Sequence, residues 1–190
     1  MTPSVSLILS KEQHPTLTFT RPDFLHPVYV KPSRLTEVTF RSALESDISS
    51  VLKLFKQTVL NSCHKHYTPL QLRVWIDSIQ DAEKWRSRIK NDYFMIAEAA
   101  GEIIGMCSLQ NNEYVDIMFV HQNFQRQGIA NQLLESILKQ AEILGTKHVY
   151  TDSSITAKLF FERKGFKAVR ANQNIVGNQV LINYKMVKEL

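Results

Sequence analysis

The sequence predicts a mixed α/β fold in which helices and a central sheet form a single domain. Two observations predict it. Helical patterns fill residues 47–91, and strand patterns dominate from residue 93 onward, interrupted by one long helix. The chain has 190 residues, of which 44% are hydrophobic and 22% are charged. These values are typical of a soluble globular protein with one well-buried core.

The first 35 residues differ in composition from the rest of the chain. Five of the six prolines lie there: Pro3, Pro15, Pro22, Pro27 and Pro32. Because proline fixes φ and lacks an N–H donor, such a segment is a poor helix or central strand. We therefore expect residues 1–35 to be a Pro-rich N-terminal extension and residues 36–190 to be the single domain.

The first half of this domain is mainly helical. After a short alternating strand pattern at 37–41, apolar residues from Asp47 to Val59 have the spacing of an amphipathic helix. The next helix is expected to begin at Thr68-Pro69, with threonine as N-cap and Gln71 at the capping-box position. Asp81 is expected to cap a third, short helix.

Strands dominate the second half. Residues 93–99 and 102–109 form a predicted hairpin, and a further turn leads into a third strand at 114–120. The strongest periodicity follows, an amphipathic helix at 130–144 that Gly145 ends. A strand at 147–151, a helix at 156–164, a loop at 170–179 and a closing strand at 179–187 complete the prediction.

Composition excludes several classes of protein. The two cysteines, Cys63 and Cys107, are too few for a disulfide scaffold or a cysteine-rich zinc site, so we expect no metal. No apolar stretch approaches the ~20 residues that span a bilayer. We therefore expect a cytoplasmic protein with no secretory signal and no membrane partner.

The net charge of +5 is concentrated near the end of the chain. Residues 155–190 hold seven basic and two acidic side chains. Such a region can attract nucleic acid or a phosphorylated small molecule, and it can also be a solvated face. Because no nucleic-acid motif accompanies it, we expect no nucleic-acid partner.

The segment between the third strand and the long helix has the features of a phosphate-binding turn. Gly128 lets the backbone pass close to a ligand, and Ala130 permits close packing of helix on sheet. The first turn of a helix presents unpaired N–H groups and the positive end of its dipole, and Arg126 adds a positive charge. This junction predicts a site for a phosphate or pyrophosphate.

Two segments together resemble the motifs of the GNAT superfamily of acyl-CoA-dependent N-acetyltransferases. Within that superfamily, the chain looks like a bacterial branch. Residues 118–131 match the family's strand, its Gln/Arg-x-x-Gly-x-Gly/Ala loop and its long helix. Residues 157–166 match its short helix ending in an aromatic residue, Phe161, before Gly165 and Phe166. The resemblance covers about residues 37–190 and implies a mostly antiparallel central sheet flanked by helices.

The resemblance also implies that acetyl-CoA is the co-substrate. The third strand would pair with its pantetheine arm, and the start of the long helix would hold its pyrophosphate. A bulge near Phe119 would free one amide for the thioester oxyanion. From the positive charge of the C-terminal region, we further expect Lys164 or Lys167 to meet the 3′-phosphate. The implied cofactor-binding residues are Met118, Phe119, Val120, Arg126, Gln127, Gly128, Ile129, Ala130, Asn131, Ser154, Phe161 and Lys164.

Two positions depart from the family pattern. Phe161 stands where many members have a tyrosine that protonates the leaving thiolate, and Ser154 stands where asparagine is frequent. Three alternatives stay open: Tyr150 or Tyr184 supplies that proton, solvent supplies it, or catalysis is impaired.

The candidate base lies on the third strand. An alkyl amine with a pKa near ~10.4 must lose a proton before it attacks. Tyr114, Asp116 and Met118 alternate onto one strand face, where Asp116 is the sole carboxylate. Asp116 is therefore either the base or an edge carboxylate bound to nearby N–H groups. The candidate catalytic residues are Asp116, Tyr114 and Tyr150.

These observations predict an N-acetyltransferase that moves the acetyl group of acetyl-CoA directly to a primary amine of a small molecule or peptide. The alternative is a CoA-binding module with weak or no transferase activity. Tyr67, Trp75 and Trp85 are candidates for the acceptor pocket, although aromatic residues on helices more often belong to the core. The acceptor and the formation of a homodimer stay open.

Overall fold

The computed structural model describes residues 37–190. The predicted extension at 1–35 lies outside the described residues, so the division of the chain at residue 35 stays a prediction. Among the described residues, no helix is long and apolar enough to cross a membrane.

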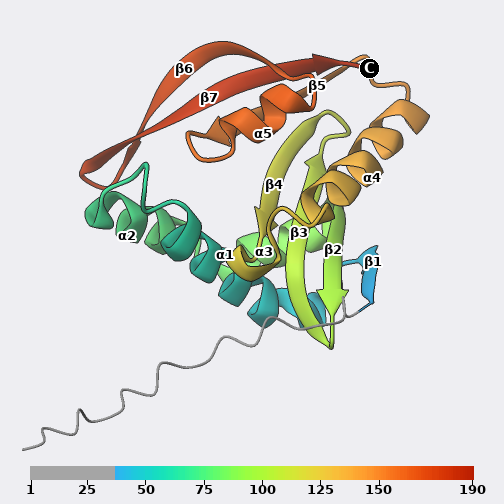
Figure 1. The fold of residues 1–190 in the computed structure, drawn as a ribbon, viewed down its shortest axis with the longest axis horizontal. Coiled ribbons are helices and arrows are strands. Elements are labelled where there is room, and N and C mark those ends of the chain that lie inside the picture. Colours follow the sequence, from blue (N-terminus) through green and yellow to red (C-terminus); the bar gives the residue numbers. More distant parts are fainter. Residues whose placement is uncertain (1–36) are drawn as a thin grey trace, which may run out of the picture. The chain divides into compact units, whose positions relative to one another are not determined.

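The fold is a mixed α/β structure built on one seven-stranded sheet (Figure 1). The strand order is β1-β2-β3-β4-β5-β7-β6, and every neighbouring pair is antiparallel except β4 with β5. The predicted fold class is therefore confirmed. The strands are β1 (Val38–Ser42), β2 (Tyr93–Ala99), β3 (Glu102–Gln110), β4 (Tyr114–Val120), β5 (His148–Ser154), β6 (Lys167–Val176) and β7 (Gln179–Glu189).

Within residues 37–190, five helices cover the sheet. They are α1 (Ile48–Ser62), α2 (Pro69–Ser78), α3 (Ala82–Asn91), α4 (Ile129–Ile143) and α5 (Lys158–Arg163), with short 3-10 turns η1 (Glu45–Asp47) and η2 (Gln122–Phe124). The predicted start of α2 is confirmed. Thr68 accepts from the Gln71 N–H, and the Gln71 side chain accepts from the Thr68 N–H, which is a complete capping box.

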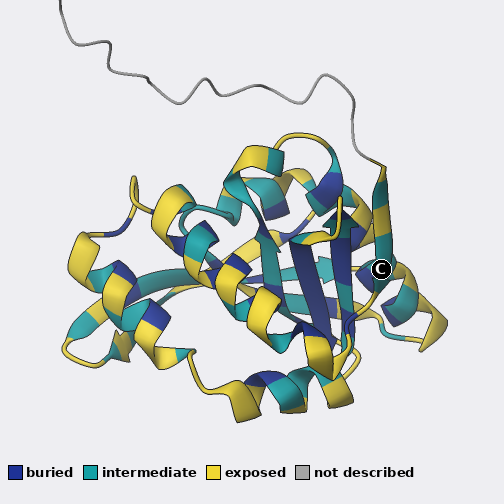
Figure 2. Cartoon of the chain, turned by 90° about the horizontal axis from the view of Figure 1, so that it is seen from below, coloured by how far each residue is buried: buried dark blue, intermediate teal, exposed yellow. Residues whose placement is uncertain are grey.

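The sheet separates two apolar cores. The α4-side core contains Leu133 and Ile137 of α4 with strand residues such as Cys107. The α1-side core contains Phe55 and Trp85 of α1 and α3 with strand residues of the opposite face. Figure 2 shows buried residues concentrated along the central strands, while the outer sides of the helices are exposed.

Gly105 of β3 allows α4 to approach the sheet closely. A Cβ at this position would lie 3.0 Å from Ile129 Cγ2 and 3.0 Å from Leu133 Cδ1. Those distances are shorter than ordinary van der Waals contacts. The absence of a side chain at Gly105 therefore lets α4 pack close against β3.

The loop predicted at 170–179 is wrong for most of its length, because residues 167–176 form β6. Most of its side chains are exposed, and asparagines such as Asn172 and Asn174 are poor strand formers. β6 is an edge strand that pairs with β7 along its length and turns at Gly177. Hairpin pairing therefore overrides local propensity here.

Candidate active site

A cavity lies where β4 and β5 part. The two parallel strands pair at only two positions, Tyr114 with Tyr150 and Val115 with Thr151. Beyond these pairs a cavity of about 320 Å³ opens between the strands, and α2, α3 and the β6–β7 hairpin complete its wall. Polar and aromatic residues of the wall include Tyr67, Trp75, Arg88, Tyr114, Asp116, Asp152, Phe161 and Asn183.

Asp116 is the extra residue of a β-bulge in β4. Ile117 pairs with Ser108 of β3, and Val115 pairs with the next residue, Leu109, so Asp116 has no partner in the β3–β4 register. The bulge predicted near Phe119 is therefore misplaced, since this residue pairs regularly within the ladder. The extra residue bends the strand at the cavity wall.

The bulge also changes which side chains share a face of β4. Val115 and Met118 both pack with the α4-side core, although they are three residues apart, and Ile117 packs with the α1-side core. The prediction that Tyr114, Asp116 and Met118 share one face is therefore wrong, because it assumed uninterrupted alternation. All three residues still line the cavity.

Asp116 is ion-paired in the cavity wall. Arg88 of α3 donates from Nε to Asp116 Oδ2 at 2.6 Å, and both side chains are largely buried. The Arg88 guanidinium also lies over the Trp85 ring, 5.4 Å from its centroid. These contacts fix the orientation of the Asp116 carboxylate.

Asp92 is a second carboxylate near this ion pair. Burial, followed by the negative charge of Asp116, raises the pKa of Asp92 to about 6, while Arg88 opposes the shift. Within residues 37–190, its buried Oδ2 has no hydrogen-bond partner. Two carboxylates therefore lie near one guanidinium at the end of α3.

Asp152 is a carboxylate of the cavity wall that hydrogen bonds hold in place. Tyr114 donates its hydroxyl to Asp152 Oδ2 at 3.0 Å, and Asn172 donates Nδ2 to Oδ1 at 3.2 Å. Among the described residues, Asp152 forms no ion pair. Burial and the Asp152 charge raise the pKa of Tyr114, so this hydroxyl keeps its proton and continues to donate.

Beyond Val115, the edge of β4 that faces β5 has no strand partner among the described residues. Gln125 Nε2 donates to Val120 O at 2.9 Å and to Ser62 Oγ at 2.8 Å, so the Val120 carbonyl points away from β3. Because peptide groups alternate along a strand, the N–H and C=O of Met118 point to the same open edge. An extended ligand can therefore pair with this edge.

The first turn of α4 follows directly. Gly128 is its N-cap with a φ of 86°, and Arg126 before it also has a positive φ, 60°. The amides of Ile129, Ala130 and Asn131 have no hydrogen-bond partner in the part of the chain that the structure describes. A Cβ at Gly128 would meet only Gln132 Nε2, at 4.0 Å, so the space beside this glycine is open.

Of the residues between 154 and 167 that were predicted to contact the cofactor, only some line the cavity. Phe161 lines it and is 2% exposed, and Ser154 lines it while its Oγ accepts from the Ala157 N–H at 3.2 Å. Lys164 is the C-cap of α5, and Lys167 begins β6. Neither lysine lines the cavity.

Tyr67 contributes a hydroxyl to the cavity wall. It donates to Ile182 O at 2.7 Å and accepts from the Ile155 N–H at 3.0 Å, and burial raises its pKa to about 12. Trp75 lines the cavity beside it, at 5.4 Å between ring centroids. Trp85 is fully buried, so it belongs to the core and does not line the cavity.

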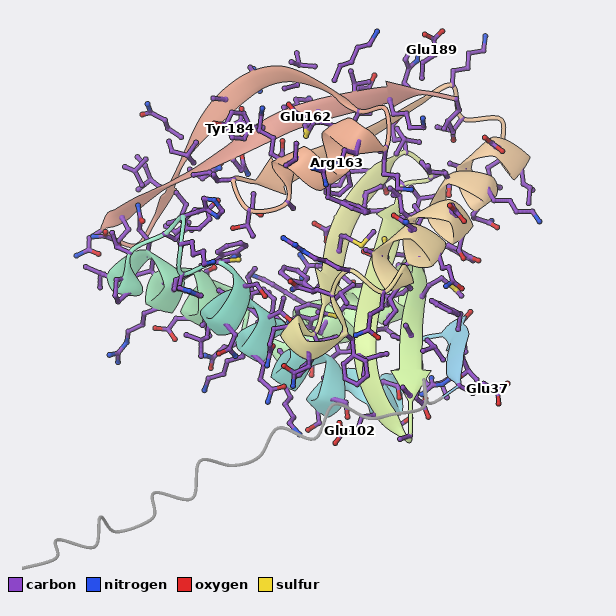
Figure 3. All side chains as sticks on the ribbon, in the orientation of Figure 1. Glu37, Glu102, Glu162, Arg163, Tyr184 and Glu189 are labelled. Atoms are coloured by element: carbon purple, nitrogen blue, oxygen red, sulfur yellow. The ribbon has the colours of Figure 1, made fainter. Side chains whose placement is uncertain are left out.

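The structure does not bring Tyr150 or Tyr184 to the cavity wall. Lys185 Nζ lies 5.6 Å from the centroid of the Tyr150 ring. Tyr184 projects from β7 beside α5 (Figure 3), where Lys158 Nζ lies 5.0 Å from its ring centroid. Of the three predicted catalytic residues, the structure therefore brings together Tyr114 and Asp116.

The cysteines take no part in the cavity. Cys107 is fully buried in β3, Cys63 is buried after α1, and burial raises the pKa of both thiols. Among residues 37–190, no three His, Cys, Asp or Glu side chains are grouped so that they could hold a metal ion.

Several polar residues of the cavity wall were not predicted from the sequence, among them Arg88, Asp152 and Asn183. Each is remote in the chain from the residues that it joins at the cavity. Asp152 lay just beyond the predicted end of its strand at residue 151. A longer strand would have placed Asp152 on the same face as its neighbour two residues earlier, Tyr150.

Comparison with known proteins agrees with this geometry. The family described as "Acetyltransferase (GNAT) domain" matches residues 63–189. The Escherichia coli K12 protein named uncharacterized N-acetyltransferase YafP is 28% identical over 136 residues, which cover 72% of this chain and 85% of that protein.

Solved structures share the fold. A GCN5-related N-acetyltransferase from Rhodopseudomonas palustris has a TM-score of 0.77 at 23% identity, covering 83% of this chain and 99% of its own. PaiA N-acetyltransferase from Thermoplasma acidophilum, in complex with coenzyme A, has a TM-score of 0.68 at 16% identity, covering 81% and 99%. A putative acetyltransferase from Salmonella typhimurium, yncA, with acetyl-CoA, has a TM-score of 0.57 at 16% identity, covering 81% and 94%.

Proposed function

The chain belongs to the GNAT acetyltransferase family and is an acyltransferase, and we propose that it moves the acetyl group of acetyl-CoA directly to a primary amine. One observation carries the proposal. The open edge of β4 leads from a cavity with an ion-paired carboxylate, Asp116, to the unpaired amides at the start of α4.

The residues at this junction fit acetyl-CoA. Backbone groups of Met118 and Val120 would pair with an extended pantetheine arm, as a neighbouring strand would. The amides of Ile129, Ala130 and Asn131 would bind the pyrophosphate, and Arg126 adds a positive charge. The relatives solved with coenzyme A and with acetyl-CoA support this assignment. When bound, acetyl-CoA supplies an activated thioester carbonyl.

Asp116 is the proposed proton acceptor for the amine. An ammonium with a pKa near ~10.4 must lose a proton before its nitrogen can attack. Arg88 holds one oxygen of Asp116 at 2.6 Å, which leaves Oδ1 as the oxygen for an acceptor amine or a bridging water. The alternative role is an edge carboxylate bound to nearby N–H groups, and the contact of Asp116 with the Arg88 Nε–H is of that kind.

Direct transfer is supported by the lack of an activated nucleophile in the cavity wall. Both cysteines are buried with raised pKa values and do not line the cavity. Ser154 Oγ is engaged with the Ala157 N–H, and no base contacts this hydroxyl among the described residues. Catalysis therefore comes from positioning the amine and from backbone dipoles near the bulge.

Solvent is the proposed source of the proton for the leaving thiolate. Phe161 has no hydroxyl, and the cavity tyrosines, Tyr67 and Tyr114, already donate theirs to Ile182 O and Asp152. A thiol has a pKa of about 8.5, so a free thiolate is a tolerable leaving group near neutral pH.

The test is release of free thiol from acetyl-CoA in the presence of a panel of primary amines. The proposal expects amine-dependent release that saturates with both substrates. One observation supports the alternative, a CoA-binding module: Phe161 lacks the hydroxyl that a tyrosine would provide at this position. Binding of acetyl-CoA with no turnover on any amine would establish the alternative.

A further inference from the structure

A polar groove continues from the cavity across the surface of β5, β7 and β6. It has a volume of about 510 Å³ and is lined by Asp152, Arg170, Asn172, Asn174 and Lys185, with Ala171 and Gln173. Asp152 and Asn174 line both the groove and the cavity. The groove is therefore contiguous with the cavity at these two residues.

A chain of hydrogen bonds fixes the floor of the groove. Arg170 Nε donates to Asn172 Oδ1 at 3.0 Å, and Asn172 Nδ2 donates to both Asn183 Oδ1 at 2.9 Å and Asp152 Oδ1 at 3.2 Å. Tyr114 donates to the other oxygen of Asp152. The polar groups from β4 to β6 are therefore oriented before any ligand binds.

Two positive charges lie side by side on this floor. Arg170 of β6 is directly opposite Lys185 of β7, and Lys185 is in turn opposite Asp152 of β5. Within residues 37–190, neither cation forms an ion pair with a carboxylate. Like charges directly opposite each other on a sheet destabilise the pairing. Asp152 and the Tyr150 ring offset part of this cost at Lys185, and an anion bound beside Arg170 and Lys185 would offset the rest.

Resting on the proposed function, we infer that the acceptor is an amine that also carries an anionic group, a carboxylate in the simplest case. The amine binds at the cavity end, near Asp116 and Asp152, and the anion binds at Arg170 and Lys185. Strands lie about 4.8 Å apart, so the two groups of the acceptor are separated by about 5–10 Å. Amino acids with a side-chain amine and peptides with an acidic residue have this chemistry.

A polyamine fits the groove less well. Its second ammonium would lie beside the positive charges of Arg170 and Lys185, which repel it. A carboxylate on the acceptor instead gains charge-assisted hydrogen bonds to the Arg170 guanidinium and the Lys185 ammonium.

The experiment compares matched ligands that differ in the anionic group. L-lysine is compared with cadaverine, which lacks only the carboxylate. The amidated tripeptide alanyl-aspartyl-alanine is compared with its asparaginyl counterpart. Each ligand is titrated calorimetrically into wild-type protein saturated with free CoA, which cannot donate an acetyl group. The first pair tests a small amino acid and the second tests a peptide as the source of the anion.

In at least one pair, we expect the anionic member to bind about tenfold more tightly or better, as one or two charge-assisted hydrogen bonds provide. Arg170→Gln and Lys185→Gln should each reduce that ratio. Lys139→Gln removes an equal charge from an exposed position on α4, outside the groove, and should preserve it.

Equal binding within both pairs, preference for the neutral member, absence of binding by all four ligands, or ratios unchanged in Arg170→Gln and Lys185→Gln would each overturn the inference. These outcomes differ from failure of the proposed function, which is seen as lack of CoA binding by the wild-type protein before any acceptor is added, or as acetyl-CoA binding with no thiol release on any amine of the panel.

Discussion

Arg88 Nε lies 2.6 Å from Asp116 Oδ2, which ties α3 to the bulge of β4 at the cavity wall. The side chains are 23% and 20% exposed, so water screens the pair only partly. The carboxylate is thereby presented to the cavity in one orientation. If Asp116 accepts the proton of the amine, this ion pair positions the base without blocking both of its oxygens.

Asp116→Asn should lower turnover by about a hundredfold or more while the affinity for acetyl-CoA stays within about twofold of the wild type, because general-base catalysis contributes on the order of 10²–10⁴. The amide keeps the shape of the side chain but cannot take a proton at neutral pH. Steady-state thiol release and calorimetric titration separate the two effects. A pH–rate profile identical to that of the wild type would remove Asp116 from the role of base.

Gly128→Glu should abolish binding of CoA without unfolding the protein. The new carboxylate would lie beside the free amides of α4 and repel the pyrophosphate, while the space there accommodates a side chain. Gly145→Glu is a matched control at the other end of α4, where φ is also positive, 78°, and the surroundings are open. Both variants carry the same backbone strain. Retention of affinity in Gly128→Glu would refute the pyrophosphate site.

Asp92→Asn should stabilise the protein above about pH 6 and have little effect below about pH 4. The pKa of Asp92 is raised from 3.8 to about 6, so the folded state binds this proton more tightly than the unfolded state does. Stability therefore falls as the pH rises through that window, because the folded carboxylate must then ionise. Asparagine removes this cost.

Urea unfolding across the same pH range measures the effect. Glu135→Gln, at an exposed position on α4, serves as control and should show no comparable trend. A pH-independent difference between Asp92→Asn and the wild type would show that Asp92 does not titrate between the two states in this range.

Gly105→Val should lower the free energy of unfolding by about 1–3 kcal/mol, the usual cost of overpacking a core. Its Cβ alone would lie 3.0 Å from Ile129 and Leu133 side-chain atoms. Ala168→Val adds methyl groups at an exposed strand position and should change stability by no more than about 0.5 kcal/mol. Equal stability of the two variants would mean that α4 can move away from β3 without cost.

Features encoded by local sequence were predictable. Thr68 and Gln71 form the expected capping box, and Gly145 ends α4 with a positive φ. β2 and β4 begin and end at the predicted residues. In each case the side chains that determine the structure lie within a few residues of one another, so one segment carries the whole signal.

Features that depend on long-range pairing were not predictable from one sequence. β6 exists because it pairs with β7, and the bulge at Asp116 appears only in the register with β3. The bulge moved Met118 to the other face of β4. The Arg88–Asp116 and Tyr114–Asp152 contacts join residues 28 and 38 positions apart, so no local pattern reports them.

Calorimetric titration of the wild-type protein with acetyl-CoA and with free CoA tests most directly the proposed cofactor site, on which the proposed function depends. The open edge of β4 and the free amides of α4 predict one site per chain with micromolar affinity, in which both ligands bind because both contain the pantetheine arm and the pyrophosphate. Absence of binding by either ligand up to millimolar concentration would contradict the proposal.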